Sequence, residues 1–283
     1  MNTTNSQPAP DIQTIKARQK ATWESGDFGE VAKLIMPIAE DFMSRIDLKP
    51  GMKVLDAACG SGNLAVIAAR RGCITSGLDI ASNLIAQARE RARQLSLDIE
   101  FTEGDAEAMP YKDATFDAVI SMYGVMFAPR PERVVAELYR VTKPGGFIGL
   151  ANWTPEGFIG KMFGVFSRHL PPPPGLASPL LWGNEVAVTS RFNGTVKDLN
   201  MTRHIARMRY PFDPATTVDF FRKYYGPTHR AFAALAPAAQ DALRHDLVEL
   251  QTRHNVARRP DETDTPAEYL EVHARRAGSN GTN

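Results

Sequence analysis

Several features that would place the chain in a specialised class of protein are scarce or absent. Its 283 residues include two cysteines, too few for the disulfide framework of a small secreted domain. No apolar run approaches the roughly 20 residues that cross a bilayer, and the first thirty residues hold no apolar core of a signal peptide. We therefore expect a cytoplasmic protein without a membrane span, working in a reducing compartment.

The chain also lacks an excess of charge of either sign. Lysine and arginine number 33 and aspartate and glutamate 32, which gives a formal net charge of +1. Without a basic surface there is no long-range field to hold a polyanion, so we expect no nucleic-acid partner. The 6 histidines are scattered without metal-ligand spacing, so we also expect no metal site.

What the chain does contain is a glycine-rich turn behind a short apolar strand. Residues 54–65 read Val-Leu-Asp-Ala-Ala-Cys-Gly-Ser-Gly-Asn-Leu-Ala. Glycine adopts positive φ and lets the backbone approach a ligand, and the following helix presents unpaired N–H groups and a positive dipole end. Asp56, at the end of the strand, can accept hydrogen bonds from an ammonium group. The segment is a candidate nucleotide- or cofactor-binding turn.

This turn alone fits two kinds of cofactor. Residues 60–65 also match G-x-G-x-x-A, the dinucleotide fingerprint of dehydrogenases, and an acidic residue, Asp79, follows at a compatible distance. A single glycine pattern does not separate the two, so the rest of the chain must decide.

Strands and helices alternate around the turn, which favours a three-layer α/β domain with right-handed crossovers. The first strand ends at Asp56, and further strands are expected over 74–79, 99–102, 116–122 and 147–152. Helices are expected over 64–71, 84–95 and 131–141, preceded by helices over 12–23 and 31–46, the latter bent at Pro37. Beyond residue 153 we expect helices over 157–170, 218–225 and 239–250 and strands over 196–210 and 269–274. Residues 1–11 and the end of the chain are expected to be disordered.

Three further segments accompany the turn in a fixed order. Gly77-Leu78-Asp79-Ile80-Ala81 ends the second strand, Gly104-Asp105-Ala106 follows the third, and the fourth strand, 116–121, leads to Arg-Val-Thr-Lys-Pro-Gly-Gly at 140–146. Together these motifs resemble the class I S-adenosylmethionine-dependent methyltransferases, in the branch of the ubiquinone/menaquinone C-methyltransferases and their small-molecule relatives. The resemblance covers about residues 50–153. A dehydrogenase has no reason to carry an acid four residues before its first glycine.

The resemblance implies a fold and a cofactor. The fold is an α/β, seven-stranded Rossmann-like sheet, mostly parallel with the last strand antiparallel, with helices on both faces and a helical insertion or lid. The cofactor is S-adenosyl-L-methionine. We divide the chain accordingly into an N-terminal helical lid segment (1–48), a cofactor-binding core (49–153), a helical insertion with the final strands on the acceptor side (154–277) and a disordered tail (278–283).

The same resemblance assigns cofactor contacts. Asp56 and the 60–62 backbone would hold the methionine part, Asp79 the ribose hydroxyls, and Asp105 the adenine amino group. The full set of expected cofactor residues is Asp56, Ala58, Gly60, Gly62, Asp79, Ile80, Asp105, Ala106 and Ser121. Each has a structural alternative. Asp79 can cap the helix after Ser82 and Asp105 can form a turn, while Cys59 is interpreted as a small buried residue rather than a nucleophile.

Aromatic residues outside these motifs are candidates for the acceptor site. We expect an apolar pocket beside the cofactor methyl group, lined by Trp23, Phe28, Tyr123, Phe127, Trp153, Tyr225 and His229. The alternatives are ordinary core packing of these side chains, and an insertion that packs away from the site as a dimer surface. No catalytic residue is assigned, and the candidate bases are Tyr123, Tyr224, Tyr225 and His229.

The function that these observations favour is methyl transfer to O, N or C of a small aromatic or hydrophobic molecule, by a monomer or homodimer. A nucleic-acid or protein methyltransferase is disfavoured by the net charge and by Met-Tyr-Gly-Val at 122–125, where an Asn/Asp-Pro-Pro-Tyr-type segment would stand. A non-catalytic protein that keeps the cofactor fold is the third possibility.

Overall fold

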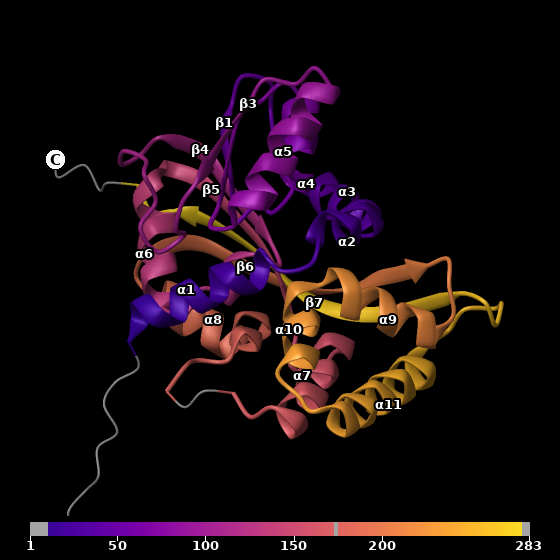
Figure 1. Ribbon diagram of the computed structural model, residues 1–283. Coiled ribbons are helices and arrows are strands. Elements are labelled where there is room, and N and C mark those ends of the chain that lie inside the picture. The colour runs from indigo at the N-terminus through magenta and orange to yellow at the C-terminus, as the bar shows by residue number, and fades with distance from the viewer. Residues whose placement is uncertain (1–10, 173–174, 279–283) are drawn as a thin grey trace, which may run out of the picture.

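A single mixed sheet organises the molecule. The computed structural model describes residues 11–172 and 175–278, and within them seven strands follow the order β3-β2-β1-β4-β5-β7-β6 (Figure 1). The strands are β1 (Lys53–Ala57), β2 (Ile74–Asp79), β3 (Ile99–Glu103), β4 (Phe116–Met122), β5 (Thr142–Trp153), β6 (Val196–Tyr210) and β7 (Thr263–Arg276). The segments expected to be disordered, 1–11 and 278–283, lie outside the described residues except for Asp11 and Gly278.

The strand directions confirm the expected sheet. β1 pairs in parallel with β2 and β4, β2 with β3, and β4 with β5. β7 runs antiparallel to both β5 and β6. Residues 118–121 of β4 are fully buried, as a strand covered on both faces requires. The carboxyl ends of β1 to β5 therefore meet at one edge of the sheet, where α/β proteins bind ligands.

Helices cover both faces of the parallel strands. In Figure 1, α3 to α5 lie on one side of the sheet and α6 and α8 on the other. The helices are α1 (Ile12–Trp23), α2 (Phe28–Leu34), α3 (Met36–Ser44), α4 (Asn63–Arg70), α5 (Ser82–Gln94), α6 (Pro131–Val141), α7 (Phe158–His169), α8 (Glu185–Phe192), α9 (Pro214–Tyr224), α10 (Gly226–Ala233) and α11 (Pro237–His254). Among the described residues, no helix is long and apolar enough to span a membrane.

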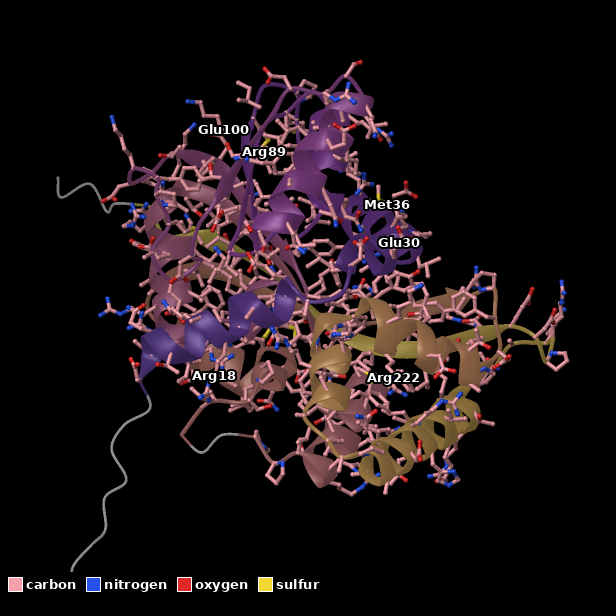
Figure 2. All side chains as sticks on the ribbon, in the orientation of Figure 1. Arg18, Glu30, Met36, Arg89, Glu100 and Arg222 are labelled. Carbon is pink, nitrogen blue, oxygen red and sulfur yellow. The ribbon has the colours of Figure 1, made fainter. Side chains whose placement is uncertain are left out.

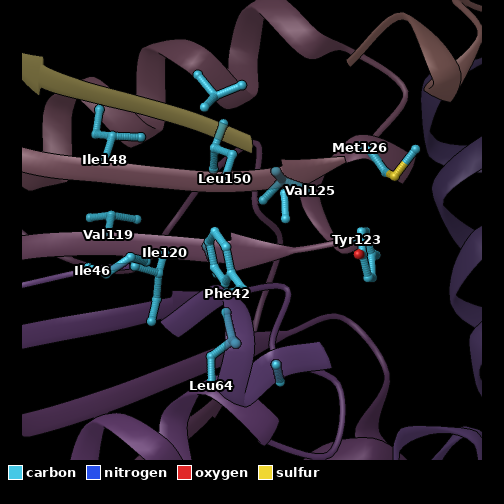
Figure 3. Packing of buried hydrophobic residues seen from close by; sticks show 14 of the residues in the cluster. Phe42, Ile46, Leu64, Val119, Ile120, Tyr123, Val125, Met126, Ile148 and Leu150 are labelled. Atoms are coloured by element: carbon cyan, nitrogen blue, oxygen red, sulfur yellow. The ribbon is translucent and has the colours of Figure 1, made fainter. Parts of the chain in front are cut away.

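The main hydrophobic core lies between the sheet and these helices. Figure 3 shows Phe42 of α3 and Leu64 of α4 on one side of β4, with Val119 and Ile120 along the strand. Each of these four side chains is buried. The cluster continues to Tyr123, so the core extends to the carboxyl edge of the sheet.

Several element boundaries differ from the expectations. The helix expected over 31–46 is two helices, because Pro37 occupies the first turn of α3 and the chain leaves the helical geometry at Ile35. β5 begins at Thr142 rather than 147, since residues 143–146 continue the strand as a bulge in which Gly145 has φ +75°. The short helices α8 and α10 were not expected. Trp182, which is 1% exposed, packs against Phe192 of α8 at a ring distance of 6.4 Å, so tertiary packing rather than local periodicity stabilises α8.

The hairpin of β6 and β7 extends past the parallel strands and carries a separate helical layer. Helices α7, α9, α10 and α11 lie around this extension, and α1 crosses the boundary between the layer and the sheet (Figure 1). A second hydrophobic cluster, formed by Val165, Val218, Phe232, Leu243 and Leu247, holds the layer together. The molecule thus has a sheet half and a helical half that meet beneath α1.

Candidate functional site

The glycine-rich turn connects β1 to α4 at the carboxyl edge of the sheet. Ala58, Gly60 and Gly62 have φ of +55°, +54° and +83°, so the chain winds through the left-handed region three times in five residues. A Cβ on Gly62 would lie 3.0 Å from the Phe101 ring. The turn therefore requires glycine for close packing as well as for conformation, and it presents the first turn of α4 to the space above the sheet.

Two buried carboxylates flank this turn. Asp56 is 2% exposed, and its Oδ2 accepts a hydrogen bond from the Ala65 amide at 2.9 Å. Asp79 is 8% exposed, and its oxygens accept from the amides of Gly60 at 2.8 Å and Ala81 at 2.9 Å. Within the described residues neither carboxylate pairs with a lysine or arginine. Burial raises the pKa of Asp56 to about 8 and also raises the pKa of Asp79.

A third carboxylate stands at the end of β3. Asp105 Oδ1 accepts from the Glu107 amide at 2.8 Å, and Oδ2 lies 2.5 Å from Lys16 Nζ of α1. Asp105 therefore stabilises the turn in which it lies, which is the structural alternative considered from the sequence. Its ion pair with Lys16 also connects the loop after β3 to α1. This ion pair was not expected from the sequence.

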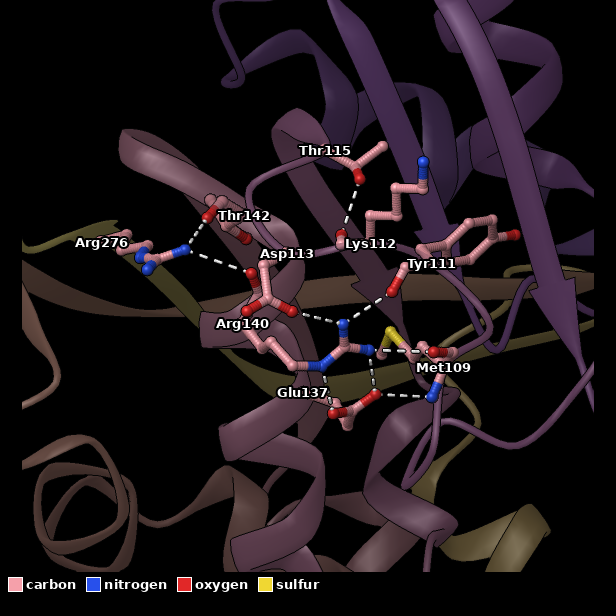
Figure 4. Close-up of polar contacts among 9 residues, drawn as sticks. All are labelled: Met109, Tyr111, Lys112, Asp113, Thr115, Glu137, Arg140, Thr142 and Arg276. Carbon is pink, nitrogen blue, oxygen red and sulfur yellow. Dashed lines mark hydrogen bonds and ion pairs between the residues drawn. The ribbon is translucent and has the colours of Figure 1, made fainter.

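The loop after β3 is fixed from behind by Arg140 of α6, as Figure 4 shows. Its guanidinium donates to the carbonyl oxygens of Tyr111 at 2.6 Å and Met109 at 2.9 Å, and pairs with Asp113 at 2.9 Å. Glu137 accepts from both Arg140 and the Met109 amide. The first residue of the Arg-Val-Thr-Lys-Pro-Gly-Gly motif therefore anchors the loop that follows Asp105 and Ala106.

These elements line a cavity that is partly open to solvent. Its floor is formed by the ends of the parallel strands, and one wall is formed by Lys16, Gln19 and Trp23 of α1. Phe28 of α2 packs on the turn, 3.4 Å from where a Gly60 Cβ would lie. The expected cofactor residues that line the cavity are Asp56, Ala58, Gly60, Asp79, Ile80, Asp105 and Ala106.

Two expected cofactor residues do not line it. Gly62 lies behind the turn against Phe101. The buried Ser121 hydroxyl donates to the Ala57 carbonyl at 2.6 Å and accepts from the Val125 amide at 3.2 Å. Ser121 thus ties the end of β1 to the loop after β4, because its side chain points into the sheet rather than toward the cavity. A cofactor contact by Ser121 through its backbone stays a prediction.

Comparison with known proteins decides between the two cofactor classes. Residues 55–150 match the methyltransferase domain family. The uncharacterized protein Rv1405c of Mycobacterium tuberculosis is 37% identical over 252 residues, which cover 87% of this chain and 92% of that one. The demethylmenaquinone methyltransferase of Thermus thermophilus is 37% identical over 135 residues, covering 46% and 61%. The crystal structure of YcgJ from Bacillus subtilis has the same fold, with a TM-score of 0.59, 15% identity and coverage of 85% and 98%.

The chain belongs to the class I S-adenosylmethionine-dependent methyltransferases. It is an enzyme of that class, and its cofactor is S-adenosyl-L-methionine. The dinucleotide interpretation of the turn is therefore rejected. The residues of the cavity also fit this cofactor: it carries an ammonium group and a sulfonium, and the cavity offers three carboxylates together with backbone amides at a helix N-terminus.

The aromatic residues expected to bind the acceptor of this methyltransferase divide into two groups. Trp23, Phe28, Tyr123 and Phe127 line the cavity. Trp153 does not, because it lies behind Tyr123 with the two rings stacked at 3.7 Å. Tyr225 is also one layer back, 5.8 Å from the Trp23 ring. Trp153 and Tyr225 were expected to line the cavity. Instead, each of them packs against an aromatic residue that lines it.

His229 lies outside the cavity altogether. Its side chain is exposed, and ring Nδ1 lies 3.2 Å from the Arg222 carbonyl on the helical layer. Tyr224 likewise packs away, 4.9 Å from the Phe220 ring. Tyr224 ends α9, which packs on α2, and His229 lies on α10, which packs on α1. In both helices the side chain in question lies on a face turned away from the cavity.

None of the four candidate bases presents a titratable atom to the cavity. The Tyr123 hydroxyl is buried with no hydrogen-bond partner among the described residues, and burial raises the pKa of Tyr123 well above its ordinary value. Burial also raises the pKa of Tyr225. A phenol whose pKa is raised stays protonated and cannot accept a proton at neutral pH. Tyr123 therefore contributes its ring.

Sequence reasoning missed Lys16 and Gln19. Both point into the cavity from α1, in line with Trp23 at helical spacing, and Gln19 Nε2 donates to the Phe127 carbonyl at 2.7 Å. The signal that could have found them is the shared face of residues 16, 19 and 23. A search for apolar periodicity overlooks this face because two of its three residues are polar.

Proposed function

We propose that this methyltransferase transfers a methyl group to O, N or C of a small aromatic or hydrophobic molecule. The observation that carries the proposal is the group of four aromatic side chains, Trp23, Phe28, Tyr123 and Phe127, on the wall of the cofactor cavity. The Trp23 ring lies 5.0 Å from Phe127 and 5.8 Å from Phe28. An apolar enclosure of this kind selects aromatic or hydrophobic acceptors and excludes water.

The carboxylates suit the cofactor end of the cavity. S-adenosyl-L-methionine supplies a methyl group already activated on a sulfonium. In this proposal Asp56 accepts hydrogen bonds from the ammonium group, Asp79 from the ribose hydroxyls, and Asp105 and the Ala106 amide hold the adenine. Asp79 keeps lone pairs for this role, because a carboxylate accepts about four hydrogen bonds and the structure uses two.

The aromatic rings suit the methyl end. Their faces stabilise positive charge through cation–π attraction, and their packing fixes where an acceptor can lie. Among the described residues that line the cavity there is no histidine, and the one tyrosine hydroxyl is buried. The chain therefore contributes alignment and water exclusion, and the acceptor supplies its own lone pair or anionic atom.

A screen with isotopically labelled S-adenosylmethionine tests the proposal. Purified protein is offered phenols, amines, quinones and, as a polyanion, bulk RNA. The expected result is label in one of the small-molecule classes and none in RNA. The variant Phe127→Ala should lower that turnover, while Tyr224→Ala, outside the cavity, should not. Label in RNA contradicts the proposal, and so does cofactor binding with no label in any of the small-molecule classes.

A further inference from the structure

A second cavity lies in the helical half of the molecule, between the β6–β7 hairpin and helices α7, α9, α10 and α11 (Figure 1). It is smaller than the cofactor cavity, and among the described residues the two have no lining residue in common. Apart from Tyr210, Thr228, Gln251 and Thr265, the residues that line it are apolar. The walls of this second cavity therefore suit a molecule that is mainly apolar.

Two buried hydroxyl groups of this lining have no hydrogen-bond partner among the described residues. They belong to Tyr210, which is 4% exposed, and Thr228, which is 1% exposed. The other two polar residues are bonded to each other, because Gln251 Nε2 donates to the Thr265 hydroxyl. A buried hydroxyl without a partner costs about 1–3 kcal/mol, and such groups are satisfied by a bound water or ligand. Both hydroxyls therefore indicate a polar atom of a molecule bound in the second cavity.

Arg222 of α9 keeps its charge outside the second cavity. It follows Phe221, which lines the cavity, and it is labelled in Figure 2. Its guanidinium lies over the Phe232 ring at 4.4 Å and donates to Gln240 Oε1 at 2.6 Å. A charged ligand would meet no counter-ion among the described residues of the lining, and burial of an unpaired charge is costly. The ligand that fits is therefore neutral.

Aromatic rings separate the second cavity from the cofactor cavity. Phe221 lines the second cavity, and its ring lies 5.7 Å from the ring of Tyr225. Tyr225 in turn lies 5.8 Å from Trp23, which lines the cofactor cavity. A ligand can therefore occupy the second cavity without displacing the cofactor.

We propose that the second cavity is a binding site for a small neutral molecule with an apolar ring or short chain and one hydroxyl or carbonyl group. Tyr210 and Thr228 hold its polar atom, and since each hydroxyl can donate or accept, an alcohol, a phenol or a ketone satisfies them. The apolar part packs on residues such as Met208, Val218 and Leu247. The inference does not rest on the proposed function, because the site is separate from the cofactor cavity.

A crystal of the protein with S-adenosylhomocysteine, soaked in p-bromophenol, tests the location of the site. The anomalous signal of bromine should lie in the second cavity, with the phenol oxygen within hydrogen-bond distance of Tyr210 and Thr228. A second cavity that holds ordered water only would overturn the inference, and so would bromine confined to the cofactor cavity.

Titration with p-fluorophenol, followed by fluorine NMR at saturating S-adenosylhomocysteine, tests the same site in solution. Thr228→Val and Tyr210→Phe each remove one hydroxyl at nearly constant volume. Each should weaken binding about three- to tenfold, the effect of one neutral hydrogen bond. Fluorobenzene, which has no hydroxyl, should bind about equally well to the wild type and to both variants.

The matched control is Tyr224→Phe, which removes a tyrosine hydroxyl of the same helical layer outside the second cavity and should bind p-fluorophenol as the wild type does. Phe127→Ala changes the cofactor cavity instead and should also leave this affinity unchanged. Unchanged affinity in both hydroxyl variants would overturn the inference, and so would a loss confined to Phe127→Ala. Neither measurement uses methyl transfer, so failure of the acceptor screen leaves the result standing.

Discussion

The two halves of the cavity are built in different ways. On the sheet side, carboxylates at strand ends bond backbone amides of the neighbouring turn, as Asp79 does with Gly60 at 2.8 Å. On the helical side, side chains remote in sequence meet one another: Trp23, Phe127 and Tyr225 come from α1, the loop after β4 and the start of α10, with ring distances of 5.0 and 5.8 Å. The first arrangement is fixed by strand register. The second is fixed by packing between side chains that are far apart in the sequence.

This difference assigns the two halves different roles. We propose that the carboxylates at the strand ends hold the cofactor, which is always the same, and that the wall of aromatic side chains meets the acceptor. The comparison predicts that changes on the sheet side alter cofactor affinity and changes on the helical side alter turnover. The following variants test that separation, from the largest effect to the smallest.

Removal of residues 1–24 should abolish most of the turnover while the sheet stays folded. The truncation deletes Trp23 and opens the cavity to water, and loss of alignment and water exclusion together costs about 100-fold or more. Because α1 contributes no buried residue, circular dichroism should lose only the helical signal of α1 itself, and the remaining chain should still unfold in one cooperative transition. Turnover within a few-fold of the full chain would contradict the helical half of the comparison.

Asp79→Ala should weaken cofactor binding by about 1.5–3 kcal/mol, the range for hydrogen bonds to a charged group. The variant also removes the acceptor for the Gly60 and Ala81 amides, so Asp79→Asn, which keeps one oxygen, should bind with intermediate affinity. Titration calorimetry with S-adenosylmethionine measures both. An unchanged dissociation constant would leave Asp79 only its role in holding the turn.

Cofactor binding should strengthen with pH below 8. Since burial raises the pKa of Asp56 to about 8, the ligand-free carboxyl is mostly protonated at neutral pH, and pairing with an ammonium group must release that proton. Affinity should rise by up to about tenfold per pH unit between pH 5.5 and 7.5. Without cofactor, the raised pKa stabilises the fold most at low pH, and this contribution is lost as pH rises through 8.

Calorimetry in buffers of different ionisation enthalpy counts the proton. Near pH 6.5 the wild type should release close to one proton per cofactor, and Asp56→Asn, which cannot ionise, should bind more weakly and release less. Equal proton release in both proteins would mean that another group, such as the neighbouring Asp79, carries the linkage.

The smallest effect is expected from Tyr210→Phe in the helical half. The Tyr210 hydroxyl is buried without a hydrogen-bond partner among the described residues, so its removal should stabilise the fold by about 1 kcal/mol. The matched variant is Tyr269→Phe, whose hydroxyl accepts from Arg45 Nη2 at 2.6 Å. Its loss should destabilise by about 1–2 kcal/mol. Urea unfolding measures the change in the free energy of unfolding for each variant, and two changes of the same sign would show that one of the hydroxyls is not placed as described.

The difference between the sheet side and the helical side of the cavity also explains how much of the structure could be predicted from the sequence. β2, β4, β6 and α6 have the expected bounds, because apolar runs and a helical N-terminal proline are local signals. The order of the cofactor motifs placed Asp56, Asp79 and Asp105 around one cavity. For the helical half, the sequence identified aromatic residues but not their register, and Trp153, Tyr225 and His229 all miss the cavity. Which face of a short helix such as α10 turns inward depends on long-range packing that no local pattern records.

The most direct test of the account is a crystal structure of the complex with S-adenosylhomocysteine. We predict that the carboxylates at the strand ends contact the ligand, and that its sulfur faces the enclosure of Trp23, Phe28, Tyr123 and Phe127 beneath a closed α1. A sulfur open to bulk solvent, or a ligand whose reactive end points away from these four rings, would contradict the account.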